Sequence, residues 1–314
     1  MDPSSIDLTS RVGSITLANP VMTASGTAGH GTELGRYVDL RSLGAHVVKS
    51  LAAFPWAGNP APRVHVAGDG MLNAIGLQGP GIQRWIVDDL PALAGIPLVV
   101  SIWGRSVDDY QRAAELLAPI AAQLLAVEVN LSCPNLEGRR GIFAHDAALS
   151  AEVLRATYAC GVPRWAKLSA NTDRVVDVAA AVIDAGAEAV TLINTLLGMV
   201  IDPATRRPLL GTFAGPGHGG GYSGRPVHPV AVRTVYDVHA ALPTVPIIGV
   251  GGVSDGWSAI ELILAGASAV QVGTASFADP RASARVLDGV RAWLAEHSVA
   301  RLSDLVGAAH PDVC

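Results

Sequence analysis

The sequence predicts a single (β/α)8 barrel, in which eight parallel strands form a closed sheet inside a ring of helices. Eight short runs are apolar throughout rather than alternating, which is typical of strands buried on both faces of a parallel sheet. Amphipathic segments separate these runs, as right-handed crossover connections require. The length of 314 residues suits one such domain, spanning 1–314. A doubly wound sheet is the alternative.

Each predicted strand is rich in β-branched and apolar residues. The eight runs are 20–25, 45–50, 97–103, 126–131, 164–168, 187–194, 245–250 and 267–272. Segments with helical spacing lie between them, several ending at Gly or Pro. They are 107–123, 147–160, 174–185, 230–241 and 258–265. The residues before the first strand alternate in character, which predicts a short N-terminal hairpin that plugs the bottom of the barrel.

Two connections, 51–81 and 195–224, are longer than ordinary loops between a strand and a helix. Both are rich in Gly and Pro, and they follow the second and sixth predicted strands. We therefore expect long loops at the C-terminal mouth of the barrel, where barrel enzymes do their chemistry. The segment GHGGGYSG at 217–224 is predicted to be flexible enough for a lid.

Composition excludes several classes of protein. A net charge of -5 argues against nucleic-acid binding, which needs a surface rich in Lys and Arg. No uncharged apolar run is long enough to span a membrane. No export signal is visible at the start of the sequence. Cys133, Cys160 and Cys314 show no CxxC spacing, and the histidines form no HxxxH pair. We therefore expect no disulfide framework, no metal site, no protein-ligated iron–sulfur cluster and a cytoplasmic location.

The only two lysines, Lys49 and Lys167, each lie near the C-terminal end of a predicted strand, in VVKS and WAKL. A buried ammonium is costly unless an anion lies nearby, so both indicate a site for an anionic ligand. The alternative is a lysine whose charged end reaches solvent at the end of a strand.

Asparagines gather at the same end of the predicted barrel. Asn130, Asn135 and Asn194 lie at or just past strands four and six, and Asn73 lies in the first long connection. Amides can donate to and accept from a planar heterocycle without a counter-charge. Each one alone could equally form a turn, but their convergence favours a binding site.

Cys133 lies in NLSCPN, directly after the fourth predicted strand. Its thiol could act as a base or nucleophile, or it could be a small buried side chain, and the residues alone do not separate these interpretations. Cys160 and Cys314 are interpreted as packing residues.

Glycines follow the last two strands, in GVGGV and QVGTA. Barrels often bind a phosphate group at these two positions, because exposed backbone N–H groups favour an anion. A phosphorylated cofactor is therefore predicted, and the GxGxxG spacing of a Rossmann turn is absent.

The motifs NPVMTASGTAG, GNPAPRV, MLNAIGLQGPG, NLSCPN and NTLLGMVID occur in an order that resembles the class 1 dihydroorotate dehydrogenases. The resemblance covers nearly the whole chain. It implies an FMN-containing barrel that oxidises dihydroorotate to orotate in pyrimidine synthesis. Cys133 would remove the C5 proton while the C6 hydride passes to flavin N5.

The resemblance also implies two sets of binding residues. Those holding the substrate would be Lys49, Asn73, Gly76, Leu77, Asn130, Asn135, Asn194 and Thr195. Those contacting the flavin would be Ala24, Ser25, Gly26, Lys49, Ser50, Asn130, Lys167, Ile193, Gly224, Gly251, Gly252, Gly273 and Thr274.

NTLLGMVID followed by TRRP resembles the subclass that uses NAD through an electron-transfer subunit carrying FAD and a [2Fe-2S] cluster. The chain would then form a homodimer or part of a heterotetramer, and the cluster would belong to the partner. In place of the GGLSG and the Lys of many members, this chain has GGGYSG and His228. His228 is also an alternative base. A relative acting on another dihydropyrimidine, or a flavin-binding protein without this activity, are the competing hypotheses.

Overall fold

The central feature of the fold is a closed sheet of eight parallel strands. The computed structural model describes residues 2, 5–132, 134–135, 141–210 and 219–311. The strand order is β3-β18-β17-β12-β11-β8-β7-β4. Its two end strands meet where Met22 and Ala45 form a parallel bridge, which excludes the doubly wound alternative. The strands are β3 (Val21–Thr23), β4 (His46–Leu51), β7 (Leu98–Ile102), β8 (Ala126–Asn130), β11 (Arg164–Lys167), β12 (Ala189–Leu192), β17 (Ile247–Val250) and β18 (Ala269–Val272).

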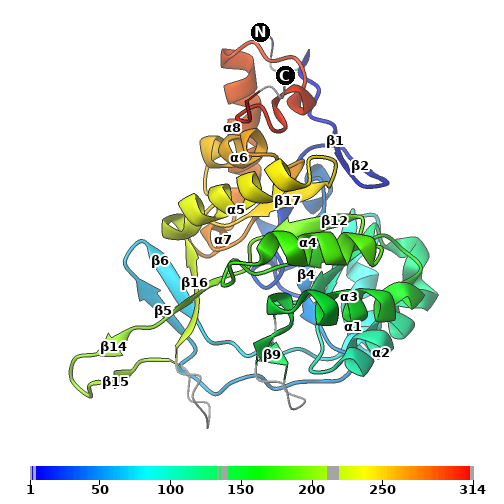
Figure 1. Cartoon of the computed structure of the whole chain (residues 1–314), viewed down its shortest axis with the longest axis vertical. Coiled ribbons are helices and arrows are strands. Elements are labelled where there is room, and N and C mark those ends of the chain that lie inside the picture. The colour runs from blue at the N-terminus through cyan, green and yellow to red at the C-terminus, as the bar shows by residue number, and fades with distance from the viewer. Residues whose placement is uncertain (1, 3–4, 133, 136–140, 211–218, 312–314) are drawn as a thin grey trace.

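Helices surround the sheet and connect its strands (Figure 1). The five predicted helices are confirmed, and two of them finish in 3-10 turns at 118–123 and 157–160. Side chains cap several first turns; Ser106, for example, accepts a hydrogen bond from the Asp109 N–H. The helices are α1 (Ile82–Asp88), α2 (Val107–Leu117), α3 (Ala147–Ala156), α4 (Val175–Asp184), α5 (His228–Ala241), α6 (Gly256–Leu264), α7 (Ala275–Ala278) and α8 (Ala282–Glu296).

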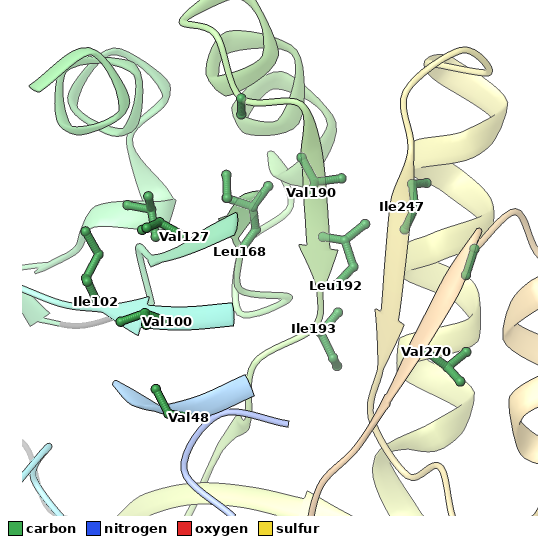
Figure 2. Packing of buried hydrophobic residues seen from close by; sticks show 14 of the residues in the cluster. Val48, Val100, Ile102, Val127, Leu168, Val190, Leu192, Ile193, Ile247 and Val270 are labelled. Atoms are coloured by element: carbon green, nitrogen blue, oxygen red, sulfur yellow. The ribbon is translucent and has the colours of Figure 1, made fainter. Parts of the chain in front are cut away.

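The strands bury apolar side chains on both faces, as the continuous apolar runs predict. On the outer face, Val100, Val127, Val190 and Val270 belong to the large cluster between sheet and helices (Figure 2). Alternate residues point inward and form a second cluster at the N-terminal end of the barrel. Its members are Val12, Leu17, Met22, Ala45, Val47, Val99, Ala126, Trp165, Ala189, Ile248 and Ala269.

The predicted N-terminal hairpin is confirmed as β1 (Ser10–Val12) and β2 (Ile15–Leu17). Val12 is 0% exposed and Leu17 is 1% exposed, and both pack into the inner cluster. Full burial of an aliphatic side chain contributes about 1.5–3 kcal/mol. The hairpin therefore closes the N-terminal end of the barrel and leaves the opposite end for ligands.

The two long connections contain strands that the sequence analysis assigns to loops. They form a four-stranded antiparallel sheet in the order β13-β16-β6-β5, and a small hairpin, β14–β15, projects away from the barrel (Figure 1). Within the segment 217–224 that is predicted as a lid, residues 220–224 are therefore a paired strand, and residues 217–218 lie outside the described residues. The strands are β5 (Val64–Ala67), β6 (Gly70–Asn73), β13 (Leu196–Gly198), β14 (Ile201–Asp202), β15 (Arg207–Pro208) and β16 (Gly220–Gly224).

The N-terminal and C-terminal segments lie close together beside α6 and α8 (Figure 1). Asp7 and Arg301 form a parallel bridge, and the N–H of Leu302 donates to the Asp7 carbonyl at 2.9 Å. In the described part of the chain, no helix has the length and apolar character needed to cross a membrane.

Candidate functional site

The predicted site residues come from one end of the barrel. Parallel strands all finish at the same end, so residues at their C-terminal ends face a common mouth. Lys49 and Ser50 lie in β4, Asn130 ends β8 and Lys167 ends β11. The other predicted residues of the barrel directly follow their strands: Ala24, Ser25 and Gly26 after β3; Ile193, Asn194 and Thr195 after β12; Gly251 and Gly252 after β17; Gly273 and Thr274 after β18.

Asn130 is the centre of a hydrogen-bond network. Its Nδ2 donates to Ser50 Oγ at 3.4 Å, and its Oδ1 accepts from Asn194 Nδ2 at 3.2 Å. The hydroxyl of Tyr110 donates to the Asn130 carbonyl at 2.6 Å. Ser50 in turn lies 2.9 Å from Ser101. The structure thus brings three predicted residues together, and the sequence analysis missed the supporting Tyr110 and Ser101.

Asn73 and Thr195 meet at strand β16. Asn73 Nδ2 donates to the Gly221 carbonyl at 3.2 Å, and the Thr195 carbonyl accepts from Asn171 Nδ2 at 3.0 Å. A Cβ on Gly221 would collide with the Thr195 side chain, so the glycine allows this close approach. Asn171 is a further residue that sequence analysis missed.

The segment after β6 folds back over the end of β4. The Trp56 indole donates to the Gly76 carbonyl at 3.0 Å, and Leu77 packs beside Ala52 and Trp103. Leu77 has φ +60, a left-handed conformation that is unusual for a leucine and often accompanies binding sites. Gly76 and Leu77 are therefore held in a constrained turn near the mouth.

Lys49 is mostly buried, and its ammonium group has no acidic partner among the described residues. Burial lowers the pKa of its ammonium group, and the positive charge of Arg63 lowers it further. No ion pair within the described part of the chain involves Lys49. An anionic ligand would supply the missing charge, as the strand-end position predicts.

Lys167 is buried with an acidic partner inside the barrel. Its Nζ donates to Ser25 Oγ at 3.1 Å and lies 3.7 Å from Glu128 Oε1. Glu128 Oε2 accepts hydrogen bonds from Thr191 at 3.2 Å and from Gln271 at 2.8 Å. Glu128 was missed, although a charged residue inside the apolar run AVEVN is a signal that could have found it.

The glycine turns after β17 and β18 can accept an anion. Gly251 has φ +136 and Gly252 has φ +72, conformations that L side chains rarely adopt. The backbone N–H groups of Gly252 and Val253 donate to no acceptor among the described residues. Thr274 Oγ1 donates to Ser223 Oγ at 2.8 Å, which joins the second turn to β16 beside Gly224. Free N–H groups in a glycine turn fit a phosphate group.

The predicted base, Cys133, lies outside the described residues. Asn135 lies in the two-residue strand β9 (Pro134–Asn135), which pairs with β10 (Gly141–Ile142). His228, the alternative base, has both ring nitrogens engaged, at 2.8 Å from the Gly251 carbonyl and 3.0 Å from Glu261 Oε2.

Comparison with known proteins agrees with this arrangement. Residues 7–294 match the family model of dihydroorotate dehydrogenase. A protein of Pelobacter propionicus is 47% identical over 305 residues, covering 96% of this chain and 98% of the relative. Relatives in Geotalea uraniireducens and Alkaliphilus metalliredigens are 43% and 42% identical, each covering 96% of this chain and 98% and 99% of the relative.

All three relatives are named dihydroorotate dehydrogenase B (NAD(+)), catalytic subunit. The match of the family model and the identity over nearly the full length of both chains bear out the resemblance found in the motifs. This chain belongs to the dihydroorotate dehydrogenase family.

Proposed function

We propose that this chain oxidises dihydroorotate to orotate in pyrimidine synthesis, with FMN as its bound cofactor. Membership of the family supports the reaction. The observation that carries the proposal is the ammonium of Lys49, which has no ion-pair partner among the described residues and directly precedes Ser50. Ser50 accepts a hydrogen bond from Asn130, which in turn accepts one from Asn194. A planar pyrimidine with a carboxylate offers an anion for the lysine and ring N–H and C=O groups for the amides.

The residues present fit FMN. The glycine turns with free N–H groups suit its phosphate, and the buried ammonium of Lys167 suits an electron-rich ring. When bound, FMN supplies an acceptor for the hydride that leaves C6 of the substrate. The residues assigned to hold it are Ala24, Ser25, Gly26, Lys49, Ser50, Asn130, Lys167, Ile193, Gly224, Gly251, Gly252, Gly273 and Thr274.

Substrate binding and proton removal are assigned to the neighbouring residues. Lys49 would hold the carboxylate, and the asparagine amides would orient the ring. The thiolate of Cys133 would take the proton from C5, so that loss of this proton and of the C6 hydride leaves a C5=C6 double bond. Ser132, directly before it, is tied to this site because its N–H donates to Asn130 Oδ1 at 3.2 Å. The remaining assigned ligands are Asn73, Gly76, Leu77, Asn135 and Thr195.

Cofactor and substrate analysis of the purified chain tests the proposal. We expect release of one FMN and dihydroorotate-dependent reduction of an artificial dye. Dihydrouracil, which lacks the carboxylate, should be a poor substrate because Lys49 then stays unpaired. Release of FAD, absence of a flavin after reconstitution, or equal turnover of dihydrouracil would contradict it.

We further propose that electrons leave through a partner. The relatives are named as NAD(+) enzymes and as catalytic subunits, which supports a second subunit. That subunit would carry FAD and a [2Fe-2S] cluster and would join a homodimer of this chain in the cytosol. The isolated chain should then reduce NAD poorly. Robust NAD reduction by the chain alone would contradict the partner, and fast fumarate reduction would indicate a different acceptor.

A further inference from the structure

His228 lies directly behind the glycine turn that follows β17. It is the first residue of α5, and its side chain is mostly buried. Nδ1 lies 2.8 Å from the Gly251 carbonyl, and Nε2 lies 3.0 Å from Glu261 Oε2 on α6. A Cβ on Gly252 would lie 2.5 Å from the His228 Cβ and 3.0 Å from its Cα, so the start of α5 packs directly against the turn.

These two contacts fix the ring between the turn and a helix. The Gly251 carbonyl only accepts hydrogen bonds, so the contact at 2.8 Å is one that Nδ1–H donates. Nε2 lies against the Glu261 carboxyl group, which ties the other side of the ring to α6.

The contact with Gly251 also sets the direction of a backbone donor. The peptide bond between Gly251 and Gly252 is trans, so its C=O and N–H point in opposite directions. Because the carbonyl points to His228, the N–H of Gly252 points away from it. That N–H donates to no acceptor among the described residues, so it is free for a ligand.

We infer that His228 is a positioning residue for the phosphate of the bound flavin: its ring links Gly251 to Glu261 and so holds the Gly252 N–H toward the phosphate. This inference rests on the proposed function. His228 acts through the backbone of the turn, whose free N–H groups favour an anion.

The charged groups around His228 come from three segments. Glu261 is on α6, Asp255 directly precedes that helix, and Arg225 lies in the 3-10 turn before α5. Burial of Asp255 opposes its ionisation, but hydrogen bonds from Ser258 and the charges of Arg225 and His228 lower its pKa. His228 thus lies near the carboxyl groups of Glu261 and Asp255, and the guanidinium of Arg225 is a further charge close to Asp255.

The affinity of the chain for two flavins tests the inference. The dissociation constants of FMN and of riboflavin, which lacks the phosphate, would be measured on the full chain by quenching of flavin fluorescence. A change at His228 that acts through the phosphate should weaken FMN binding and leave riboflavin binding nearly unchanged.

Variants separate the position of the turn from general packing. His228→Ala should weaken FMN binding roughly 10-fold, the cost of a lost hydrogen bond at the turn, and should leave riboflavin binding nearly unchanged. His228→Lys should keep most of the FMN affinity, because an ammonium group can still donate to the Gly251 carbonyl. Glu261→Gln should also keep most of it, because an amide can still contact Nε2. His310→Ala is the matched control, since His310 also contacts a backbone carbonyl, Ala265, at 3.0 Å.

Equal weakening of FMN and riboflavin by His228→Ala would overturn the inference, as would no weakening of either. Those results would leave the proposed function intact, provided that the wild-type chain binds FMN. A wild-type chain that binds no FMN would overturn both.

Discussion

Lys49 has a role that can be tested through its charge. Its ammonium is mostly buried and has no counter-ion in the part of the chain that the structure describes, so a carboxylate ligand should gain strongly from it. We expect Lys49→Met to weaken orotate binding by roughly 10-fold to 100-fold at saturating FMN. Lys49→Arg should retain part of the affinity.

The pH dependence of orotate binding follows from the same residue. Because burial lowers the pKa of Lys49, its charge is lost at a lower pH than in a free lysine. As the pH rises, the affinity of the wild type for orotate should therefore begin to fall before pH ~10.5 is reached. The affinity of Lys49→Met should not change over the same pH range. Titrations by flavin absorbance measure both, and equal pH profiles would contradict the assignment.

Lys167 and Glu128 form a buried pair, and its effect on stability can be separated from its effect on FMN binding. Their side chains are 5% and 0% exposed, so removal of one leaves the other charge uncompensated. Lys167→Met should lower the free energy of unfolding by about 3–5 kcal/mol and weaken FMN retention.

The double variant Lys167→Met with Glu128→Gln supplies the control. It should recover much of the stability, because no buried charge remains, yet it should not recover FMN affinity. Denaturant unfolding and flavin titration distinguish the two properties. Recovery of both together would show that Lys167 contributes packing rather than a charge to the flavin site.

At the scale of elements, the N-terminal hairpin should contribute stability without contributing to the site. Leu17 is buried at the end of the barrel opposite the mouth, so Leu17→Ala should cost about 2–5 kcal/mol. The exposed Val87 on α1 is a matched control, with an expected change within about 0.5 kcal/mol for Val87→Ala. Denaturant unfolding measures both, and orotate affinity should be unchanged. A large loss of orotate affinity in Leu17→Ala would contradict the separation of the two ends.

The barrel strands could be predicted from the sequence because each is buried on both faces and reads as a continuous apolar run. The strands of the antiparallel sheet could not. In β16, GGYSG has a low intrinsic strand preference, and its pairing with β6 and β13 comes from segments about 150 and 20 residues away.

The residues of the candidate site also divide into those that could be predicted from the sequence and those that could not. Strand-end residues such as Lys49 and Lys167 could be predicted because parallel strands bring their C-terminal ends together. The residues that hold them, such as Glu128, Tyr110 and Asn171, act through contacts between distant elements that no local pattern records. The family motifs indicate the binding residues, but they do not indicate the residues that support them.

For the whole molecule, buried histidines predict weaker folding in mild acid. Burial lowers the pKa of His30, His46, His145 and His239. Below pH ~6.5 the unfolded chain therefore binds more protons than the folded chain, and stability falls as the pH falls. We expect a lower thermal midpoint at pH 5.5 than at pH 7, measured with saturating FMN.

His46 tests the cause of this acid sensitivity. Its Nε2 lies 3.1 Å from the Gly31 carbonyl and its Nδ1 lies 3.2 Å from Thr23 Oγ1, both inside the fold. His46→Gln can keep one such contact without titrating, so the difference between pH 7 and pH 5.5 should shrink. A midpoint that is constant or rises toward pH 5.5 in the wild type would contradict the explanation.

The most direct test of the proposed reaction is anaerobic stopped-flow mixing of the FMN-loaded chain with dihydroorotate. The flavin absorbance of the wild type should bleach as the substrate is oxidised. Cys133→Ala should still bind orotate, because binding is assigned to Lys49 and the asparagines, but bleaching should slow by roughly 10²–10⁴-fold without the base. Cys133→Ser should keep a little activity that rises with pH, because a hydroxyl is a weaker acid than a thiol. Bleaching of Cys133→Ala at nearly the wild-type rate would contradict the role of Cys133, and a wild-type flavin that stays oxidised would contradict the proposed function itself.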